Sequence, residues 1–536
     1  MRTSTALASG ASGGSSFTAE FLRVKMLAER GVANAQHSLG FMYFNGQGIA
    51  PDHALAVTWY RQAASQGLEH AQYNLGVMYQ KGQGVSQDYE QAAHWYHLAA
   101  EQGYAAAQYN LGWLFAKGQG IAQDSAQAMR WFSKAADQGD AGAQNNLGLM
   151  YDTGKGVPQD FCQAVAWYRK AAEQGYARAQ FNLGQRYDKG QGVATDALEA
   201  MAWLRKAAEQ DYAPAQFSLA LRYDKGEGLV PDRQKAISWY RRAAAQNHVS
   251  SQFNLGLLLD SGQGAPRDEQ EALACYRGAA NQGHAGAQNN LGSRYALGQG
   301  LAQDYELARM WYRKAAEQGF AAAQYQLGLL YENGDGVAAD QQEAILWYRR
   351  AADQGHLQSQ FELALRYETG QGVARDVVLA MAWYRRAAEH EYAAAQYMLA
   401  LLHDLDDGPA PNGQRAHDWY LRAAEQGHTL AQFKLGLRYD SGQGTLQDYE
   451  AALSWYLKAA RQGHARAQFN VGLMFLNGQG TPADHMQAYL WLSMAEKNGA
   501  AARTYIAQAA AQLGPIALTR AQERLDIMPQ VIVLPS

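Results

Sequence analysis

The sequence is poor in cysteine, with only Cys162 and Cys275 among 536 residues, so a fold held together by many disulfides is excluded. It also lacks a long apolar run, and no transmembrane helix is expected. Lysine and arginine number 46 and aspartate and glutamate 50, a net charge of −4. Surfaces that bind nucleic acid usually need a basic excess. The composition therefore argues against membrane insertion and against a nucleic-acid partner.

Motifs of common catalytic sites are also missing, because the sequence has no G-x-S-x-G, H-E-x-x-H, Walker or S-x-x-K pattern. His94 and His97 lie one helical turn apart, with Glu90 a turn earlier, and could begin a metal site. An exposed helix edge is the commoner explanation of such a group. We therefore predict a protein that is not an enzyme and that has no cofactor and no metal site.

What the sequence does contain is a unit of 36 residues that recurs without insertion. Gln36 has a counterpart every 36 residues up to Gln468, thirteen in all, and Trp59 has counterparts up to Trp491, interrupted once by Cys275. Such a period is typical of an array of stacked repeats, in which each repeat contacts mainly its neighbours. Cys162 lies three repeats before Cys275, beyond disulfide reach, so we expect free thiols and a reducing compartment.

Each unit is predicted to contain two helices. In one unit, small or apolar residues mark one face of the first helix and a stripe on the second. They are Ala107, Leu111, Gly112 and Phe115, and then Ala128, Trp131, Phe132, Ala135 and Ala136. Gly118 is expected to end the first helix and Asp124 to cap the second. The small residues let the helices approach closely, and the ring of Trp131 is expected to fill the remaining space.

These residues resemble the Sel1-like repeat, a subclass of the tetratricopeptide-like helical repeats. Residues 179–187 (AQFNLGQRY) and 164–175 (AVAWYRKAAEQG) follow that pattern almost letter for letter. The resemblance covers roughly residues 17–500. It implies an all-α fold, a right-handed superhelical solenoid of helix-turn-helix repeats (an α/α superhelix). As an indicator of function it is weak, because such repeats serve as scaffolds for many unrelated partners.

The sequence predicts five segments. They are a disordered, low-complexity N-terminus (1–16), an N-terminal capping helix (17–31), thirteen repeats (32–500), C-terminal capping helices (501–527) and a tail (528–536). Residues 1–16 have no apolar core of the kind a secretory signal needs, so we expect a cytoplasmic protein. A monomer is favoured.

One repeat, residues 395–427, departs from the pattern. His403 replaces the usual Tyr, Asn412 replaces the capping Asp, and the loop between them carries two prolines and several acids. The spacing of the acids does not match a calcium loop. One explanation is sequence variation that a surface loop tolerates. The alternative is a joint in the superhelix or a contact specific to a partner.

Two rows of polar residues on the first helices are the candidate partner-binding site. The rows consist of Asn74, Asn110, Asn146, Asn182, Asn254 and Asn290, with Asn470 in the same register, and of Arg186, Arg222, Arg294, Arg366 and Arg438. Because first helices line the concave surface of helical solenoids, the amides could bind a peptide backbone and the guanidinium groups carboxylates. The alternative is internal pairing. Asparagine here belongs to the family pattern, and each of Arg186, Arg222, Arg366 and Arg438 has an acid two residues later.

The sequence therefore favours a non-enzymatic scaffold that binds protein or peptide partners in a bacterial cytoplasm. One alternative is an exported effector or immunity-type protein that acts at the envelope or on a host. The other is an RNA-binding helical repeat, which the balanced charge disfavours.

Overall fold

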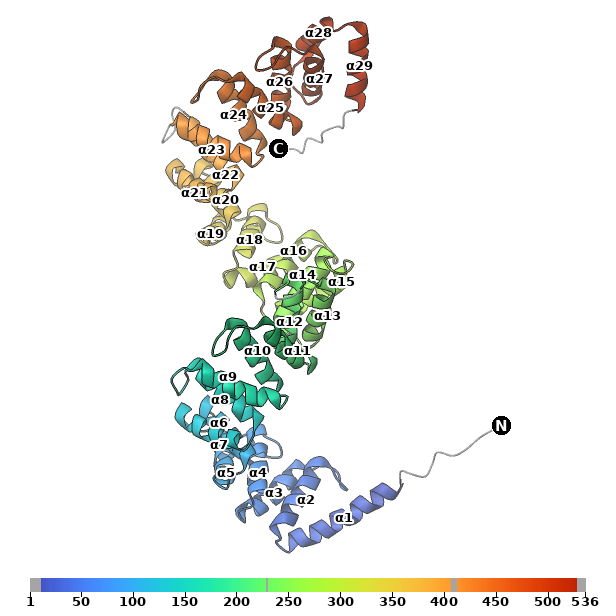
Figure 1. The fold of residues 1–536 in the computed structure, drawn as a ribbon, viewed down its shortest axis with the longest axis vertical. Helices are drawn as coiled ribbons and strands as arrows, with labels where there is room; N and C mark the ends of the chain where they lie inside the picture. The colour runs from blue at the N-terminus through green and yellow to red at the C-terminus, as the bar shows by residue number, and fades with distance from the viewer. Residues whose placement is uncertain (1–10, 228–229, 406–411, 528–536) are drawn as a thin grey trace, which may run out of the picture. The chain divides into compact units, whose positions relative to one another are not determined.

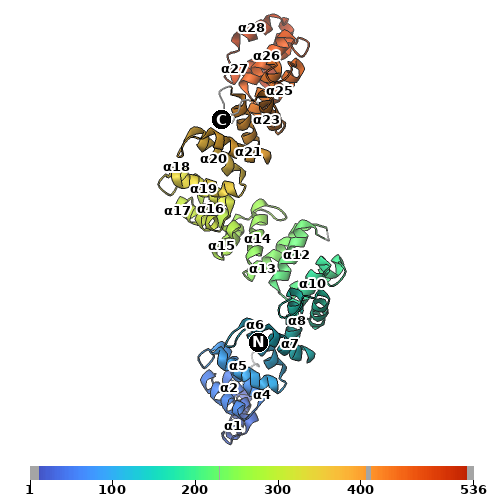
Figure 2. The same cartoon turned by 90° about the vertical axis from the view of Figure 1, so that its left-hand side faces the viewer.

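The computed structural model describes residues 11–227, 230–405 and 412–527, and every regular element in these ranges is an α-helix. Figures 1 and 2 show successive helices packed side by side along the chain. The predicted all-α solenoid of helix-turn-helix repeats is confirmed. The chain divides into two compact units, residues 1–275 and 276–536, and each is described by itself.

Unit 1 contains α1 and seven first helices alternating with second helices. Its helices are α1 (Ala11–Glu29), α2 (Ala33–Asn45), α3 (His53–Ser65), α4 (Glu69–Lys81), α5 (Tyr89–Glu101), α6 (Ala105–Lys117), α7 (Ser125–Asp137), α8 (Ala141–Thr153), α9 (Phe161–Glu173), α10 (Ala177–Lys189), α11 (Ala197–Glu209), α12 (Ala213–Lys225), α13 (Arg233–Ala245) and α14 (Val249–Ser261). Helix α15 (Glu269–Asn281) contains the boundary between the units.

Unit 2 continues the same alternation and ends in α28 and α29. Its helices are α16 (Ala285–Leu297), α17 (Tyr305–Glu317), α18 (Ala321–Asn333), α19 (Gln341–Asp353), α20 (Leu357–Thr369), α21 (Val377–Glu389), α22 (Ala393–Asp404), α23 (Gly413–Glu425), α24 (Thr429–Ser441), α25 (Tyr449–Arg461), α26 (Ala465–Asn477), α27 (His485–Lys497), α28 (Arg503–Ala511) and α29 (Pro515–Ile527). From α2 to α27, even-numbered helices are the first helices of repeats, and odd-numbered helices are the second.

The helix boundaries follow from the residues predicted to set them. Gly118 ends α6 in the left-handed region with φ 68°, which glycine adopts without a steric penalty, and its N–H donates to the carbonyl of Leu114. Asp124 caps α7, because its carboxylate accepts hydrogen bonds from the N–H groups of Ala126 and Gln127. The same cap recurs at most second helices of the repeats, so both predicted boundary signals are confirmed.

The space between the helices is filled mainly by the aromatic residue that follows the recurring tryptophan. Tyr168 is fully buried, whereas Trp167 is half-buried. Gly148 of the preceding first helix lies directly beneath the Tyr168 ring, and a Cβ atom there would come within 2.6 Å of it. The expectation that the tryptophan is the main filler holds for Trp131, which is buried. In most other repeats the following residue has that role.

Helices α1, α28 and α29 lie at the two ends of the repeat array. Helix α1 begins at Ala11, so residues 11–16 are helical and not part of a disordered segment as the sequence predicted. Phe21 and Ala28 of α1 are buried against the first repeat. At the other end, α28 and α29 occupy residues 503–527 and both pack on α27. Residues 1–10 and the predicted tail lie outside the described residues.

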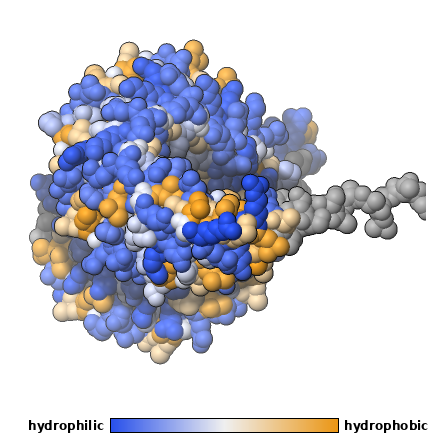
Figure 3. Space-filling model, turned by 90° about the horizontal axis from the view of Figure 1, so that it is seen from below, coloured by the Kyte–Doolittle hydropathy of each residue, from blue (hydrophilic) through white to orange (hydrophobic). Residues whose placement is uncertain are grey.

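The end of unit 1 that carries α1 has a mixed surface. Figure 3 shows apolar side chains scattered among hydrophilic ones at this end. Among the exposed apolar residues of α1 are Leu22, 59% exposed, and Met26, 48% exposed. Within the described part of the chain, no helix combines the length and the apolar character that crossing a membrane requires.

Candidate partner-binding face of the first helices

The thirteenfold glutamine is part of the stacking of the repeats. Gln108 is buried, and its amide nitrogen donates to the carbonyl of Ala100 in the preceding second helix at 3.0 Å. Its amide oxygen accepts from Gln138, just after the following second helix, at 2.8 Å. One side chain therefore ties its own first helix to both second helices beside it. The same pair of bonds recurs along both units, so this glutamine is buried in contacts between helices and is not accessible to a partner.

The arginine row is mostly buried and pairs between repeats. Arg186 of α10 forms an ion pair of 2.9 Å with Asp152, the last acid of α8. Arg222 pairs in the same way with Asp188, and Arg438 with Asp404. In each case the arginine pairs with an acid of the preceding repeat, and not with the acid two residues after itself. The separation along the sequence is 34 residues in the pairs formed by Arg222 and Arg438.

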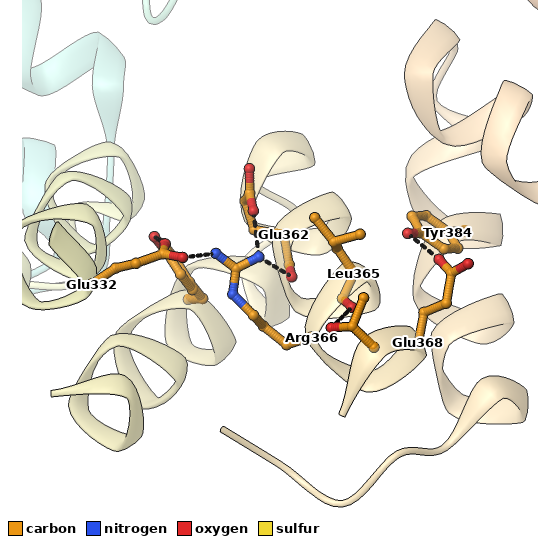
Figure 4. Close-up of polar contacts among 8 residues, drawn as sticks. Glu332, Glu362, Leu365, Arg366, Glu368 and Tyr384 are labelled. Carbon is orange, nitrogen blue, oxygen red and sulfur yellow. Dashed lines mark hydrogen bonds and ion pairs between the residues drawn. The ribbon is translucent and has the colours of Figure 1, made fainter. Parts of the chain in front are cut away.

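Arg366 shows the most complete version of this contact. Figure 4 shows its guanidinium group between Glu332 of α18 and Glu362 of α20, and the second of these pairs measures 2.7 Å. Its side chain is only 7% exposed. Burial alone would lower the pKa of Arg366, but the negative charges of Glu332 and Glu362 raise it above its usual value. The group is therefore a charged tie within the solenoid.

Acids in the register of Glu332 also accept hydrogen bonds from buried tyrosines of the second helices, whether or not they pair with an arginine. Tyr348 donates to Glu332 at 2.6 Å. Tyr384 donates to Glu368 at 2.8 Å (Figure 4). Burial, followed by the adjacent carboxylate, raises the pKa of Tyr348 and of Tyr384. The hydroxyl groups therefore stay protonated as donors. Each acid joins the first helix that carries it to the second helix that follows.

These contacts favour internal pairing as the main role of Arg186, Arg222, Arg366 and Arg438. Arg294 is also buried. A guanidinium group that is buried and neutralised by a neighbouring repeat has little capacity left for a partner. The role of the five arginines in binding remains a prediction that these contacts do not favour.

The asparagine row is half-buried and makes partial internal contacts. Asn74 lies 2.9 Å from the ring nitrogen of His37. Asn182 donates to Asn145 at 3.0 Å, and Asn254 donates to the hydroxyl of Tyr240 at 3.2 Å. Three further members make weaker or less direct contacts of the same type, namely Asn110, Asn146 and Asn290. Because each amide offers more donors and acceptors than these contacts use, the row keeps capacity for a partner.

A hollow opens on this face in unit 2. It measures about 730 Å³ and is lined by Phe433, Lys434 and Leu437 of α24 and by Arg466, Phe469 and Asn470 of α26. We call it the basic hollow. Asn470 belongs to the asparagine row, and Lys434 occupies the same register one repeat earlier. The hollow is therefore built by the face on which the sequence placed the candidate site.

The basic hollow continues toward the preceding first helix. A second hollow of about 450 Å³ shares Phe433, Lys434 and Arg466 with it and reaches Tyr397 of α22 and His464. The rings of Phe433 and His464 lie 4.4 Å apart between their centres. Among the described residues no carboxylate is paired with Lys434 or Arg466. The two hollows thus form one groove with apolar walls and positive charge.

Sequence reasoning identified Asn470 but missed Arg466 and the two phenylalanines as a site. The sequence does contain a signal for this site, because two residues differ from those at the same position in most repeats. Arg466 stands where most repeats have a small or neutral residue, and Lys434 stands where most have an amide. Both departures fall in adjacent repeats, so stacking brings their side chains to one groove.

The histidines that follow the repeat-ending glycines are helix caps. Nδ1 of His428 accepts a hydrogen bond from the N–H of Ala431 at 3.3 Å, and its ring stacks on Tyr397 with 4.7 Å between ring centres. Burial lowers the pKa of His428, which keeps the ring neutral and able to accept.

The two histidines considered as a possible metal site lie against tryptophan rings. His94 packs against Trp95, and His97 packs against Trp131. The described residues contain no group of three potential ligands placed to hold a metal ion. Cys162 is exposed and Cys275 is partly buried, and both thiols are free, as expected. In the degenerate repeat His403 is buried, and most of its acidic loop lies outside the described residues.

Comparison with known proteins agrees with this architecture. No protein of established annotation matches the sequence. A crystal structure of a protective antigen present in uropathogenic Escherichia coli strains, which displays an SLR fold, is 35% identical. The match covers 83% of this chain and 99% of that chain, with a TM-score of 0.68. A Sel1 repeat protein from Oxalobacter formigenes is 34% identical over 46% of this chain and 96% of its own, with a TM-score of 0.40.

The family model of the Sel1 repeat matches thirteen consecutive segments of 36 residues, from residue 33 to residue 500. These segments coincide with the repeats whose glutamine, glycine and tyrosine contacts are described above. Repeats of this family generally act as scaffolds for protein interaction, without enzymatic activity of their own. The chain belongs to the Sel1 repeat family.

Proposed function

We propose that this protein is a non-enzymatic scaffold that binds protein or peptide partners along the exposed face of its first helices. The observation that carries the proposal is the groove formed by the basic hollow and its neighbour. Its Lys434 and Arg466 take no part in the stacking contacts of the solenoid, unlike the buried glutamines and arginines. Charged side chains that do not support the fold and that surround an apolar hollow are suited to binding a partner.

Half-buried asparagines also lie on the first helices of unit 1. In unit 1, Asn146 and Asn182 keep hydrogen-bonding capacity that the described contacts do not use. An extended peptide presents a carbonyl and an N–H group at each residue, and side-chain amides can pair with both. We propose that the partner is held in a cytoplasm, where two free thiols are stable.

A second candidate is an exported protein that acts at the bacterial envelope or on a host. The similarity to a protective antigen of uropathogenic Escherichia coli favours it, since an antigen is met outside the bacterial cytoplasm. Cell fractionation distinguishes the two locations. Recovery of the chain in the periplasm or in the medium would support this second candidate.

Site-specific photo-crosslinking tests the scaffold proposal. A photoreactive phenylalanine replaces Asn146 or Asn182 on the first helices, and in control variants it replaces Lys170 on the second helix α9. Lys170 is exposed on this second helix and lies over the ring of Trp167. Mass spectrometry should identify the same partner from both first-helix positions and none from Lys170. Crosslinking from Lys170 alone would show that the partner binds elsewhere.

A further inference from the structure

The basic hollow carries local positive charge in a chain that is acidic overall. The whole chain carries a net charge of −4, but the hollow contains Lys434 and Arg466 and no carboxylate among its lining residues. Lys434 is half-buried, which reduces the screening of its charge by water, and Arg466 is exposed at the rim. A positive field therefore occupies an apolar groove in a chain that is acidic overall.

The effect of this charge is visible on a neighbouring group. The pKa of His464 is lowered by burial and, in addition, by the positive charge of Arg466. No carboxylate offsets that charge at this position, in contrast to the arginines of the buried row. A ligand with negative charge would supply the missing counter-charge.

The walls of the groove set a second requirement. The rings of Phe433 and Phe469 and the side chain of Leu437 line it, and Leu430 is exposed beside it. These apolar surfaces lose contact with water only if the ligand brings apolar side chains of its own. A small inorganic anion would satisfy the charge but leave the walls exposed.

The arrangement also fixes the length of the ligand. Three first helices, α22, α24 and α26, contribute to the groove, and neighbouring helices lie about 8–10 Å apart. The groove thus spans about 20 Å, and an extended chain covers that distance with about six residues at about 3.3 Å each. Asn470 lies in the groove and can bind the backbone of such a chain.

We propose that the groove of α22, α24 and α26 binds an extended acidic segment of a partner protein, about six residues long, in which carboxylates alternate with large apolar side chains. Lys434 and Arg466 bind the carboxylates, and Phe433, Leu437 and Phe469 take the apolar side chains. This inference rests on the proposed scaffold function and names the partner chemistry at one place on it.

Fluorescence anisotropy with labelled hexapeptides tests the proposal on the full chain. The probes alternate glutamate with leucine or phenylalanine, and a second set replaces each glutamate by glutamine. The glutamate peptides should bind at least about tenfold more tightly, because charge-assisted bonds are stronger than neutral ones. Their affinity should fall as salt is raised from about 0.05 to 0.5 M.

Two substitutions in the groove and two controls locate the binding site. Lys434→Gln and Arg466→Gln should each weaken the glutamate peptides by about tenfold and leave the glutamine peptides unchanged. Lys458→Gln removes a cation that lies over Trp455 on the second helix α25, and Arg178→Gln removes the residue of unit 1 in the same register as Arg466. Both controls should bind like the unaltered chain.

The proposal is overturned if no glutamate peptide binds, if glutamine peptides bind equally well, or if the two groove substitutions have no effect. Tighter binding of a single-stranded oligothymidylate at the same residues would also overturn it in favour of a nucleic-acid ligand. These results are independent of the crosslinking experiment. Partner crosslinks from Asn146 and Asn182 with no binding of acidic peptides would leave the scaffold function standing and remove only this inference.

Discussion

The buried arginine–carboxylate pairs are contacts between repeats in which each charge depends on the other. Arg186 is buried beside Asp152, and the hydroxyl of Tyr168 also reaches that carboxylate, at 3.3 Å. Two buried charges that neutralise each other add little net stability, whereas a single buried charge is strongly destabilising. The repeat before this one has Ala116 and Met150 at the same registers and needs neither charge.

A double-mutant cycle on Arg186 and Asp152 compares the cost of removing one charge with the cost of removing both. Arg186→Met should cost about 3 kcal/mol, because Asp152 is left without its counter-charge. The combination with Asp152→Ala, which recreates the residues of the preceding repeat, should cost about 1 kcal/mol or less. Urea unfolding measures both values. If the two changes are simply additive, the pair is not a coupled tie and Arg186 regains its place as a candidate binding residue.

The sequence contains the information for these pairs, but proximity along the chain points to the wrong partner. Every arginine of the row has an acid 34 residues before it, in the preceding repeat. The acids two residues after Arg186, Arg222, Arg366 and Arg438 are nearer in sequence, yet they lie further along the helix and contact other groups. Glu368, for example, accepts from Tyr384. The correct pairing depends on how one first helix stacks on the next, which the local pattern does not determine.

At the scale of the helix, the histidine caps make unit 2 sensitive to pH. His428 caps α24 only while its Nδ1 is unprotonated, and burial lowers its pKa below the usual value. Protonation also places a positive charge at a helix N-terminus, which the helix dipole disfavours. Since the folded state binds the proton less readily than the unfolded state, this cap contributes full stability above the ordinary histidine pKa. The contribution is lost as the pH falls through the lowered folded pKa.

A substitution at this cap tests the pH dependence. Asp140 occupies the same register in unit 1 and caps α8, with its carboxylate accepting from the N–H of Ala143 at 2.7 Å. His428→Asp should therefore keep the cap and reduce the loss of stability between pH 7 and pH 5 by about 1 kcal/mol. Urea unfolding at the two pH values measures the effect. An identical loss in both proteins would show that His428 does not contribute to it.

Helix positions, ends and caps could be predicted from the sequence because the repeat shows each of them many times. The residues that fill the core could be predicted less completely. Tyrosine and tryptophan are adjacent and equally regular, so periodicity alone does not show that Tyr168 is fully buried and Trp167 only half-buried. The recurring Gly148 register is the missing clue, since only a small residue fits beneath the tyrosine ring. The basic hollow was not predictable, because it depends on which side chains of adjacent repeats leave an open space between them and which charges lack a counter-charge.

For the whole molecule, the contact pattern predicts that stability is distributed along the chain. Substantial contacts between described helices join consecutive helices, and the only further pair is α27 with α29 at the C-terminal cap. Loss of one core side chain should then weaken its own repeat and its neighbours, because the free energy is a sum of local and nearest-neighbour contributions. A single cooperative core would instead transmit the loss to every helix.

Hydrogen exchange on two matched variants tests this distribution. Tyr168→Ala removes a fully buried ring from unit 1 and Tyr456→Ala removes its equivalent from unit 2, each at a local cost of about 3–5 kcal/mol. The first variant should lose amide protection in α8, α9 and α10 and keep it in α24 to α26, and the second should show the reverse. Tyrosine is the better choice here than the half-buried tryptophan beside it, since its removal leaves the larger cavity. A uniform loss of protection from end to end in either variant would contradict the nearest-neighbour description, because a cavity in one repeat can reach distant helices only through a shared core.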